Sequence, residues 1–255
     1  MTRKATYSAI AAASLGLAAF TGSATAAELG DTGFSVNGSV TLTSDYVFRG
    51  FSQTDEDPAL QGSFDLSHET GFYVGTWGSS VDFNEDPDSI AAIDDADEGA
   101  HLEIDYYGGF ATDLGAMGME ALSVDTGIAY FTYPGAEDDL DYDYLEYYGT
   151  ASYDFGVASV SAGFDLTDEF FGDAGNAEHF RAGVAVPLLN DRVTLSANIG
   201  DQSIDEAEDY VHYNLGASVS FAENYSLSAK FVDTDIDDSS DIADSRGVVS
   251  LSGAF

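Results

Sequence analysis

From residue 34 onward, apolar and polar residues alternate along much of the chain. In the first such stretch, residues 34–48, the even positions are mostly apolar and the odd positions mostly polar. Successive side chains of a β-strand point to opposite faces, so this alternation predicts a strand with one apolar and one polar face. Arg49 shares the parity of the polar positions, and we therefore expect it to continue the polar face.

Further segments with the same alternation, or with a strand's length and apolar content, follow to the C-terminus. Together with the first they predict twelve strands, the others covering residues 60–66, 72–83, 102–110, 121–133, 143–153, 157–167, 178–186, 193–200, 210–221, 225–232 and 245–255. Short connections near 68–71, 112–118, 154–156, 188–191 and 222–224 alternate with long acidic ones at 50–58, 84–99, 134–142, 168–177, 201–209 and 233–244. Short turns at one end and long loops at the other, on an even number of strands, are typical of bacterial outer-membrane barrels.

A secreted soluble barrel or sandwich would show similar alternation, with its apolar faces buried. The placement of aromatic residues favours a membrane barrel, because two aromatic girdles flank a plainer band on lipid-facing surfaces. The expected girdles are Tyr46, Phe48, Tyr130, Tyr147, Phe164 and Phe231 toward the long loops, and Phe34, Phe110, Tyr153, Phe221, Tyr225 and Phe255 toward the short turns. We expect an all-β, transmembrane, up-and-down antiparallel barrel of about 12 strands, each long enough to cross a bilayer when tilted.

The N-terminus has the features of a secretory signal peptide. Arg3 and Lys4 precede an apolar run over residues 5–20, which is followed by Ala-Thr-Ala at 24–26. A membrane anchor is the alternative, but the run is short for a spanning helix, which needs about 20 apolar residues. The sequence therefore predicts a cleaved signal peptide over residues 1–26 and one barrel domain over residues 27–255.

The charge balance is strongly acidic. The chain has 46 Asp and Glu residues against 7 Lys and Arg, a formal net charge of −39, and no cysteine. Nucleic acid is excluded as a natural partner, because phosphate binding requires clustered cations. An exported chain without cysteine also has no disulfide framework.

Several stretches resemble the TorF family of porins, also called Gcw_chp. They read TSDYVFRGFSQT, PALQGSFDLSHETGFYVGTWGSSVDF, LEIDYYGGF, IAYFTYPG and LEYYG. The resemblance covers nearly all of the chain after the signal peptide and implies a channel-like protein of the outer membrane of Gram-negative bacteria, in contact with its lipids. It supplies no catalytic or binding residues. The final segment, RGVVSLSGAF, ends in an aromatic residue, Phe255, and resembles the signal that such barrels present to their insertion machinery.

If the apolar face contacts lipid, the charged residues of the strands point into the barrel. The expected pore-lining residues are Asp45, Arg49, Asp65, Glu103, Asp105, Asp125, Glu146, Asp165, Arg181, Lys230 and Arg246. Closure would place Arg49, Lys230 and Arg246 on three neighbouring strands, opposite a wall of acids. Two interpretations stay open: a transverse field across an open pore, as charged walls create in channels, or paired charges that fill a narrow barrel.

The sequence shows no established catalytic motif, and we expect neither enzymatic activity nor a cofactor. Three of the four histidines, His101, His179 and His212, have the parity of the interior. One loop imitates a calcium site in its spacing of Asp233, Asp235, Asp237 and Asp244, but it lacks the glycine and the final glutamate of an EF-hand.

Two functions follow from these observations. The first is a channel for passive diffusion of small solutes or ions, with cation preference because acidic loops concentrate cations at the mouth. The second is a closed structural or interaction barrel whose acidic loops bind divalent cations or a partner.

Overall fold

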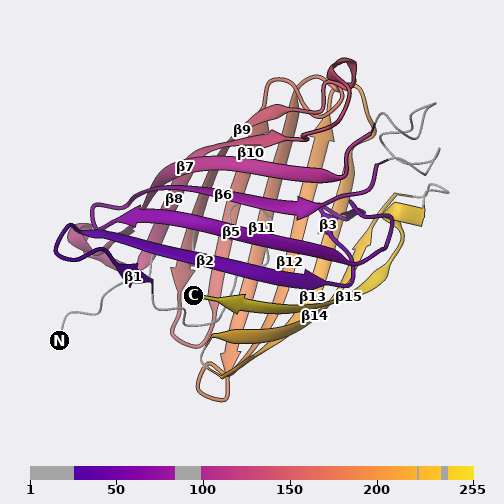
Figure 1. Ribbon diagram of the computed structural model, residues 1–255. Coiled ribbons are helices and arrows are strands. Elements are labelled where there is room, and N and C mark those ends of the chain that lie inside the picture. The colour runs from indigo at the N-terminus through magenta and orange to yellow at the C-terminus, as the bar shows by residue number, and fades with distance from the viewer. Residues whose placement is uncertain (1–25, 84–98, 223, 237–240) are drawn as a thin grey trace.

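The structure, a computed structural model, is a closed antiparallel β-barrel (Figure 1), described here over residues 26–83, 99–222, 224–236 and 241–255. Its strands are β1 (Ala27–Glu28), β2 (Phe34–Thr43), β3 (Val47–Phe48), β4 (Phe51–Ser52), β5 (Ala59–His68), β6 (Phe72–Ser80), β7 (Leu102–Leu114), β8 (Met119–Thr132), β9 (Tyr144–Asp154), β10 (Ser159–Thr167), β11 (Ala177–Leu188), β12 (Val193–Ile204), β13 (Tyr210–Phe221), β14 (Tyr225–Thr234) and β15 (Arg246–Ala254). Three 3₁₀ turns, η1 (Gly115–Met117), η2 (Asp138–Leu140) and η3 (Asp241–Ala243), are the helical elements in these ranges.

Twelve of the strands form the barrel wall, and the predicted fold class is confirmed. Each wall strand pairs with the next along the chain, and β2 pairs with both β15 and β5, which closes the ring. At the seam, the Gly38 and Phe255 backbones exchange two N–H···O bonds of 2.9 and 3.0 Å. Closure leaves no free sheet edge, as a barrel in lipid requires.

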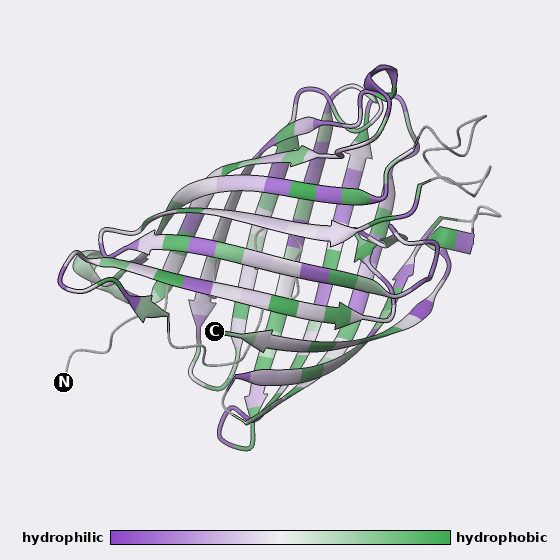
Figure 2. Ribbon diagram, viewed as in Figure 1, coloured by the Kyte–Doolittle hydropathy of each residue, from purple (hydrophilic) through white to green (hydrophobic). Residues whose placement is uncertain are grey.

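The outward-facing side chains are apolar and exposed, whereas the inward-facing ones are mostly polar. Leu42, Leu60 and Leu215 point outward and are each more than half exposed. Figure 2 shows green and lilac residues alternating along the strands. Within the described ranges, no helix is long and apolar enough to cross a membrane. An apolar outer surface around a polar interior is the reverse of a soluble barrel, and it fits a lipid environment.

The first strand ends five residues earlier than the alternation predicts. β2 stops at Thr43, and residues 44–58 turn into the barrel as an inward hairpin built on β3 and β4. Its tight turn places Arg49 and Gly50 at positive φ angles of 46° and 99°. Tyr46 and Phe48 therefore pack inside the barrel, and their expected place in a lipid-facing girdle is wrong. A tight hairpin preserves the alternation of residue types, which is why the sequence pattern did not reveal it.

The aromatic residues expected on the wall strands do face outward. Exposed side chains near the long loops include Tyr130, Tyr147 and Phe231, and near the short turns Tyr153 and Tyr225. β12 also runs to Ile204, four residues beyond its expected end, and takes residues from the predicted acidic loop.

Glycines inside the barrel make room for large side chains on the neighbouring strand. Gly75 lies directly opposite Tyr107, and Gly127 directly opposite Tyr148. A Cβ atom at Gly75 would lie 2.5 Å from the Tyr107 ring, and one at Gly127 would lie 2.5 Å from the Tyr148 hydroxyl. These contacts are too short for any other residue, so each glycine leaves the space that the tyrosine side chain opposite it occupies.

Candidate functional site: the barrel interior

Arg49 anchors the tip of the inward hairpin to the opposite wall. Its Nη2 atom donates to Glu146 Oε2 at 2.6 Å, and its Nη1 atom donates to Gln202 Oε1 at 3.0 Å. A second carboxylate, on Asp165, lies 3.9 Å away, and the guanidinium sits 4.7 Å from the centre of the Phe48 ring. The Arg49 and Glu146 side chains are 7% and 2% exposed, so this is a buried, charge-assisted contact.

Asp45 holds the base of the same hairpin. Its Oδ1 atom accepts hydrogen bonds from the hydroxyls of Ser52 at 2.7 Å and Thr54 at 3.1 Å. Its Oδ2 atom lies 3.3 Å from Arg246 Nη1, and Arg246 also reaches Glu56 at 3.4 Å. The hairpin of residues 44–58 is thus fixed at two places, at its base by Asp45 and at its tip by Arg49.

Aromatic side chains and carboxylates fill the interior under the hairpin on the β6–β7 side. Tyr46 packs edge-on against Trp77 at 5.3 Å, and its hydroxyl donates to Glu103 at 3.2 Å. Asp105, directly opposite Trp77, is 2% exposed. Glu103 Oε2 and Asp105 Oδ1 have no hydrogen-bond partner among the described residues. This part of the interior is packed rather than open.

A tyrosine network continues this packing toward the short turns. The Tyr73 hydroxyl donates to Asp125 at 2.6 Å and lies 2.5 Å from the Tyr148 hydroxyl. Tyr107 donates to Asp65 at 2.5 Å. Glu103, Asp125 and Asp65 thus each accept a hydrogen bond from a tyrosine, and the half of the barrel formed by β5 to β9 is largely filled.

The other half, formed by β9 to β14, contains a polar cavity of about 410 Å³, here called the lumen cavity. The inward hairpin covers its loop-end side through Val47, Arg49 and Gly50, and it extends toward the short turns. Asn198 Nδ2 donates to Asn214 Oδ1 at 2.9 Å across its wall. Asn198 is exposed to solvent although it points inward, so water reaches the cavity.

Two hydrogen-bonded histidines lie at the long-loop end of the lumen cavity. His179 Nδ1 lies 2.8 Å from Asp165 Oδ2, and His179 Nε2 lies 2.9 Å from His212 Nε2. Arg181 Nε donates to the same Asp165 oxygen at 2.9 Å, and its Nη2 donates to Thr150 at 2.8 Å. Asp165 thus orients one histidine and one arginine at the cavity wall.

The eleven residues expected to line a pore all lie inside the barrel, but they separate into two groups. Arg49, Arg181 and Lys230 line the lumen cavity, and the other eight do not. At the hairpin, cation and acid meet directly in the Arg49–Glu146 pair, which is the paired arrangement that the sequence left open. Gln202 and Trp77 were not expected to take part, because an uncharged residue in an alternating strand carries no signal of its partner.

The calcium-like spacing does not form a metal site in the residues that can be placed. The Asp233 carboxylate accepts a hydrogen bond from the Tyr213 hydroxyl, and Asp235 accepts one from the Val211 N–H at 2.7 Å. Asp237 lies outside the described residues. Across the described ranges, no three His, Asp or Glu side chains are arranged to hold a metal ion.

Two acids meet at the surface of the long-loop end. The carboxylate of Asp173 raises the pKa of the fully exposed Asp141 above its ordinary value, because like charges disfavour ionisation. The Gly172 N–H donates to the Asp141 carbonyl at 3.0 Å, which holds the two loops together despite this repulsion.

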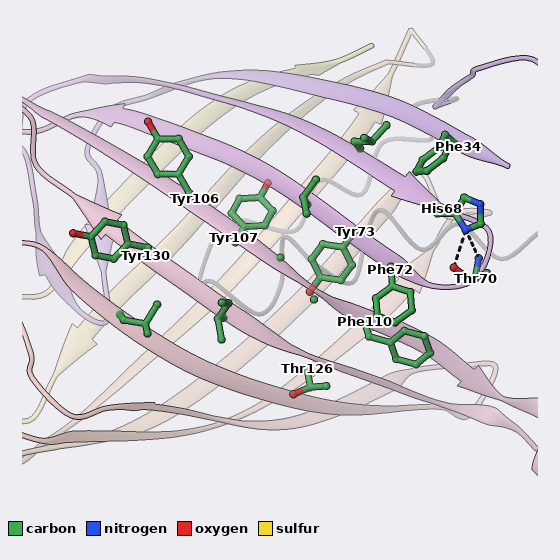
Figure 3. A pocket seen from close by; sticks show the side chains of 16 residues that line it. Phe34, His68, Thr70, Phe72, Tyr73, Tyr106, Tyr107, Phe110, Thr126 and Tyr130 are labelled. Atoms are coloured by element: carbon green, nitrogen blue, oxygen red, sulfur yellow. Dashed lines mark hydrogen bonds between the residues drawn. The ribbon is translucent and has the colours of Figure 1, made fainter. Parts of the chain in front are cut away.

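A second hollow, of about 940 Å³, lies on the outer face over β5 to β8 (Figure 3). Four of the residues that line it are Phe72, Phe110, Tyr106 and Tyr130, and the rings of Phe72 and Phe110 lie 5.0 Å apart. This groove is part of the apolar outer surface and is separate from the lumen cavity.

A family model described as "Bacterial protein of unknown function (Gcw_chp)" matches residues 27–254. The chain belongs to this family. The description of this family model does not include the name TorF, which stays a prediction. No curated protein matches the chain.

Solved porin structures share the fold. The KdgM porin superposes with a TM-score of 0.56 at 7% identity, covering 86% of this chain and 98% of that one. The NanC porin gives a TM-score of 0.53 at 9% identity, with the same two coverages. At these identities the likeness establishes the barrel architecture.

Proposed function

We propose that this protein is a porin-like channel of the Gram-negative outer membrane through which small solutes diffuse passively. The apolar outer surface provides the contact with membrane lipids. Phe255, which follows β15 and is 67% exposed, is the residue through which we propose that barrel insertion machinery recognises the chain. The cleaved signal peptide over residues 1–26, nearly all of which lie outside the described range, stays a prediction and would bring the chain to that membrane.

The observation that carries the proposal is the inward hairpin above a water-accessible cavity. A structural barrel needs no polar, hydrated space, whereas the lumen cavity occupies about 410 Å³ and is lined by hydroxyl, amide and cationic groups. The hairpin lies where a constriction would control passage, and the buried contacts of Arg49 with Glu146 and Gln202 fix its tip. A segment inside the barrel would narrow the route, and its charged side chains would act on the solutes that pass, as rings of charge do in channels.

We also propose that the channel prefers cations to anions. The long loops carry most of the chain's acids, and such a rim attracts cations and repels anions at low ionic strength. Salt screens these charges over a Debye length of about 10 Å at 0.1 M, so the preference should weaken as salt rises. The reversal potential across a salt gradient measures it, and an anion-selective reversal potential would contradict it.

The second candidate, a closed structural or interaction barrel whose loops bind divalent cations or a partner, is supported by the packed half of the interior. Planar-bilayer recording of the purified, detergent-folded protein distinguishes the two. Steady conductance supports a channel. Silence from protein that shows a heat-dependent shift on electrophoresis, and is therefore folded, supports the closed barrel.

A further inference from the structure

The lumen cavity has the opposite charge character to the rest of the molecule. The chain has 46 acids, yet among the described residues none of the side chains lining this cavity is Asp or Glu. Three of the five Lys and Arg residues that follow residue 27 do line it, namely Arg49, Arg181 and Lys230. Such separation of charge within so acidic a barrel indicates a site for an anionic group.

Two of these cations are already engaged by carboxylates behind the wall. Arg49 contacts Glu146 at 2.6 Å, and Arg181 contacts Asp165 at 2.9 Å. Each arginine keeps its place through these contacts, and its charge is largely compensated there. Neither arginine therefore supplies the main attraction for an anion, although both preserve a cavity wall without negative charge.

Lys230 is different. It forms no hydrogen bond and no ion pair with any residue in the described part of the chain, although it is half-buried and lines the cavity. Asp45 is the acid that acts on it electrostatically, and Asp45 is already bonded by Arg246, Ser52 and Thr54. Removing an ammonium group from bulk water without a partner is costly, so its position favours a ligand that supplies negative charge.

Neutral hydrogen-bonding groups line the same cavity as this lysine. Asn198, Asn214, Ser196 and Ser228 lie on β12, β13 and β14 and line the same cavity. Gly216, directly opposite Lys230, removes the side chain that would otherwise cover it. Hydroxyl and amide groups bind ligand hydroxyls, and a volume of about 410 Å³ lies in the range of single small-molecule sites.

We propose that the lumen cavity binds a small organic carboxylate that also carries hydroxyl groups, with its carboxylate on Lys230. This inference names a ligand class for the cavity of the proposed channel and rests on that function in part. It is compatible with an acidic mouth, because the rim lies at the long-loop end and the cavity lies beyond the hairpin, toward the short turns. A bound carboxylate would neutralise Lys230 and leave the charge of the rim unchanged.

Equilibrium dialysis of the folded protein in detergent tests the proposal with a matched pair of probes, radiolabelled gluconate and sorbitol. The two share a six-carbon hydroxylated chain and differ in the carboxylate. We expect saturable gluconate binding that excess sorbitol does not displace. Displacement by sorbitol at equal concentration, or no gluconate binding at millimolar concentration, would overturn the proposal without any variant being made.

Lys230→Gln removes the charge and keeps the length of the side chain approximately. We expect gluconate affinity to fall about tenfold or more, because a hydrogen bond to a charged group is lost. Arg192→Gln is the matched control, since it also removes one cation, but from an exposed short turn outside the cavity. Equal losses in the two variants would show that net charge rather than Lys230 is responsible and would contradict the proposal.

Binding and conduction can fail independently in this design. Dialysis requires a folded cavity but no current, whereas bilayer recording requires current but no ligand. A protein that binds gluconate and stays silent would support the site and refute the channel. A protein that conducts and binds no gluconate would support the channel and refute the site.

Discussion

The side chains of Arg49 and Glu146 meet at 2.6 Å inside the barrel, although one comes from the tip of the inward hairpin and the other from the wall strand β9. Both are nearly inaccessible to solvent. Breaking a buried pair by removing one partner is destabilising, because the remaining charge is left uncompensated in a poorly solvated site. The pair therefore acts as a latch that keeps residues 44–58 across the interior.

Glu146→Gln should loosen this latch while preserving the shape of the site. With Arg49 held only by Gln202 and the more distant Asp165, the hairpin should leave its seated position more often. We expect a larger or more variable single-channel conductance than in the unmodified protein, measured in planar bilayers. Arg49→Ala should act in the same direction and should also cost about 3–5 kcal/mol of stability, since it strands a buried carboxylate.

Glu120→Gln provides the control for this experiment, because it removes an exposed acid near a short turn. Its conductance should match that of the unmodified protein. If Glu146→Gln and Arg49→Ala both leave the conductance unchanged in a conducting protein, the hairpin is structural and does not control passage.

Trp77 reports whether the hairpin is seated. It is the only tryptophan of the chain, is 6% exposed, and packs against Tyr46 of the hairpin. Tyr46→Ala should shift its fluorescence emission to longer wavelength and increase quenching by acrylamide, because water gains access to the indole. Tyr225→Ala, on the exposed outer surface, should leave the emission unchanged. An unchanged spectrum in Tyr46→Ala would mean that the hairpin does not cover Trp77.

The wall of the barrel could be predicted from the sequence, but the arrangement inside it could not. The number of strands follows mainly from the period-two alternation, which most strands carry locally. Closure and the outward apolar face were indicated by the regular exchange of short turns and long loops and by the placement of the aromatic residues. The contacts of Arg49 depend instead on where a hairpin tip arrives after turning inward, and neither Glu146 nor Gln202 carries a local sign of it. The charge pattern also did not predict that tyrosines pack among the acids of the interior. That packing depends on glycines that lie opposite the tyrosines on neighbouring strands.

The Asp141–Asp173 contact predicts a pH-dependent loop. Asp173 raises the pKa of Asp141 in the folded protein, so the repulsion is present above that raised pKa and is relieved as the pH falls through it. Hydrogen exchange of the Gly172 N–H, which donates to the Asp141 carbonyl, should therefore slow relative to its intrinsic rate on mild acidification.

Asp173→Asn should lower the pKa of Asp141 toward its ordinary value and weaken this pH dependence, because Asp173 is the largest of the charges that raise it. Asp191→Asn, an exposed acid on a short turn at the other end of the barrel, should have no effect on it. Carboxyl NMR titration of Asp141 measures the shift directly. The same titration curve with and without Asp173 would show that the two carboxylates do not interact in solution.

The pairing of Tyr148 with Gly127 predicts that even one methyl group at Gly127 is harmful. Its Cβ atom would overlap the Gly108 carbonyl oxygen and lie 2.5 Å from the Tyr148 hydroxyl, so both the backbone and the tyrosine would have to move. We expect Gly127→Ala to destabilise the barrel by about 1–3 kcal/mol, the usual cost of overpacking. Gly247→Ala is the matched control, because no atom lies within 4 Å of its added methyl group. Urea unfolding followed by the heat-dependent shift on electrophoresis compares the two. Equal stability of the two variants would show that the packing of Tyr148 does not require a glycine at position 127.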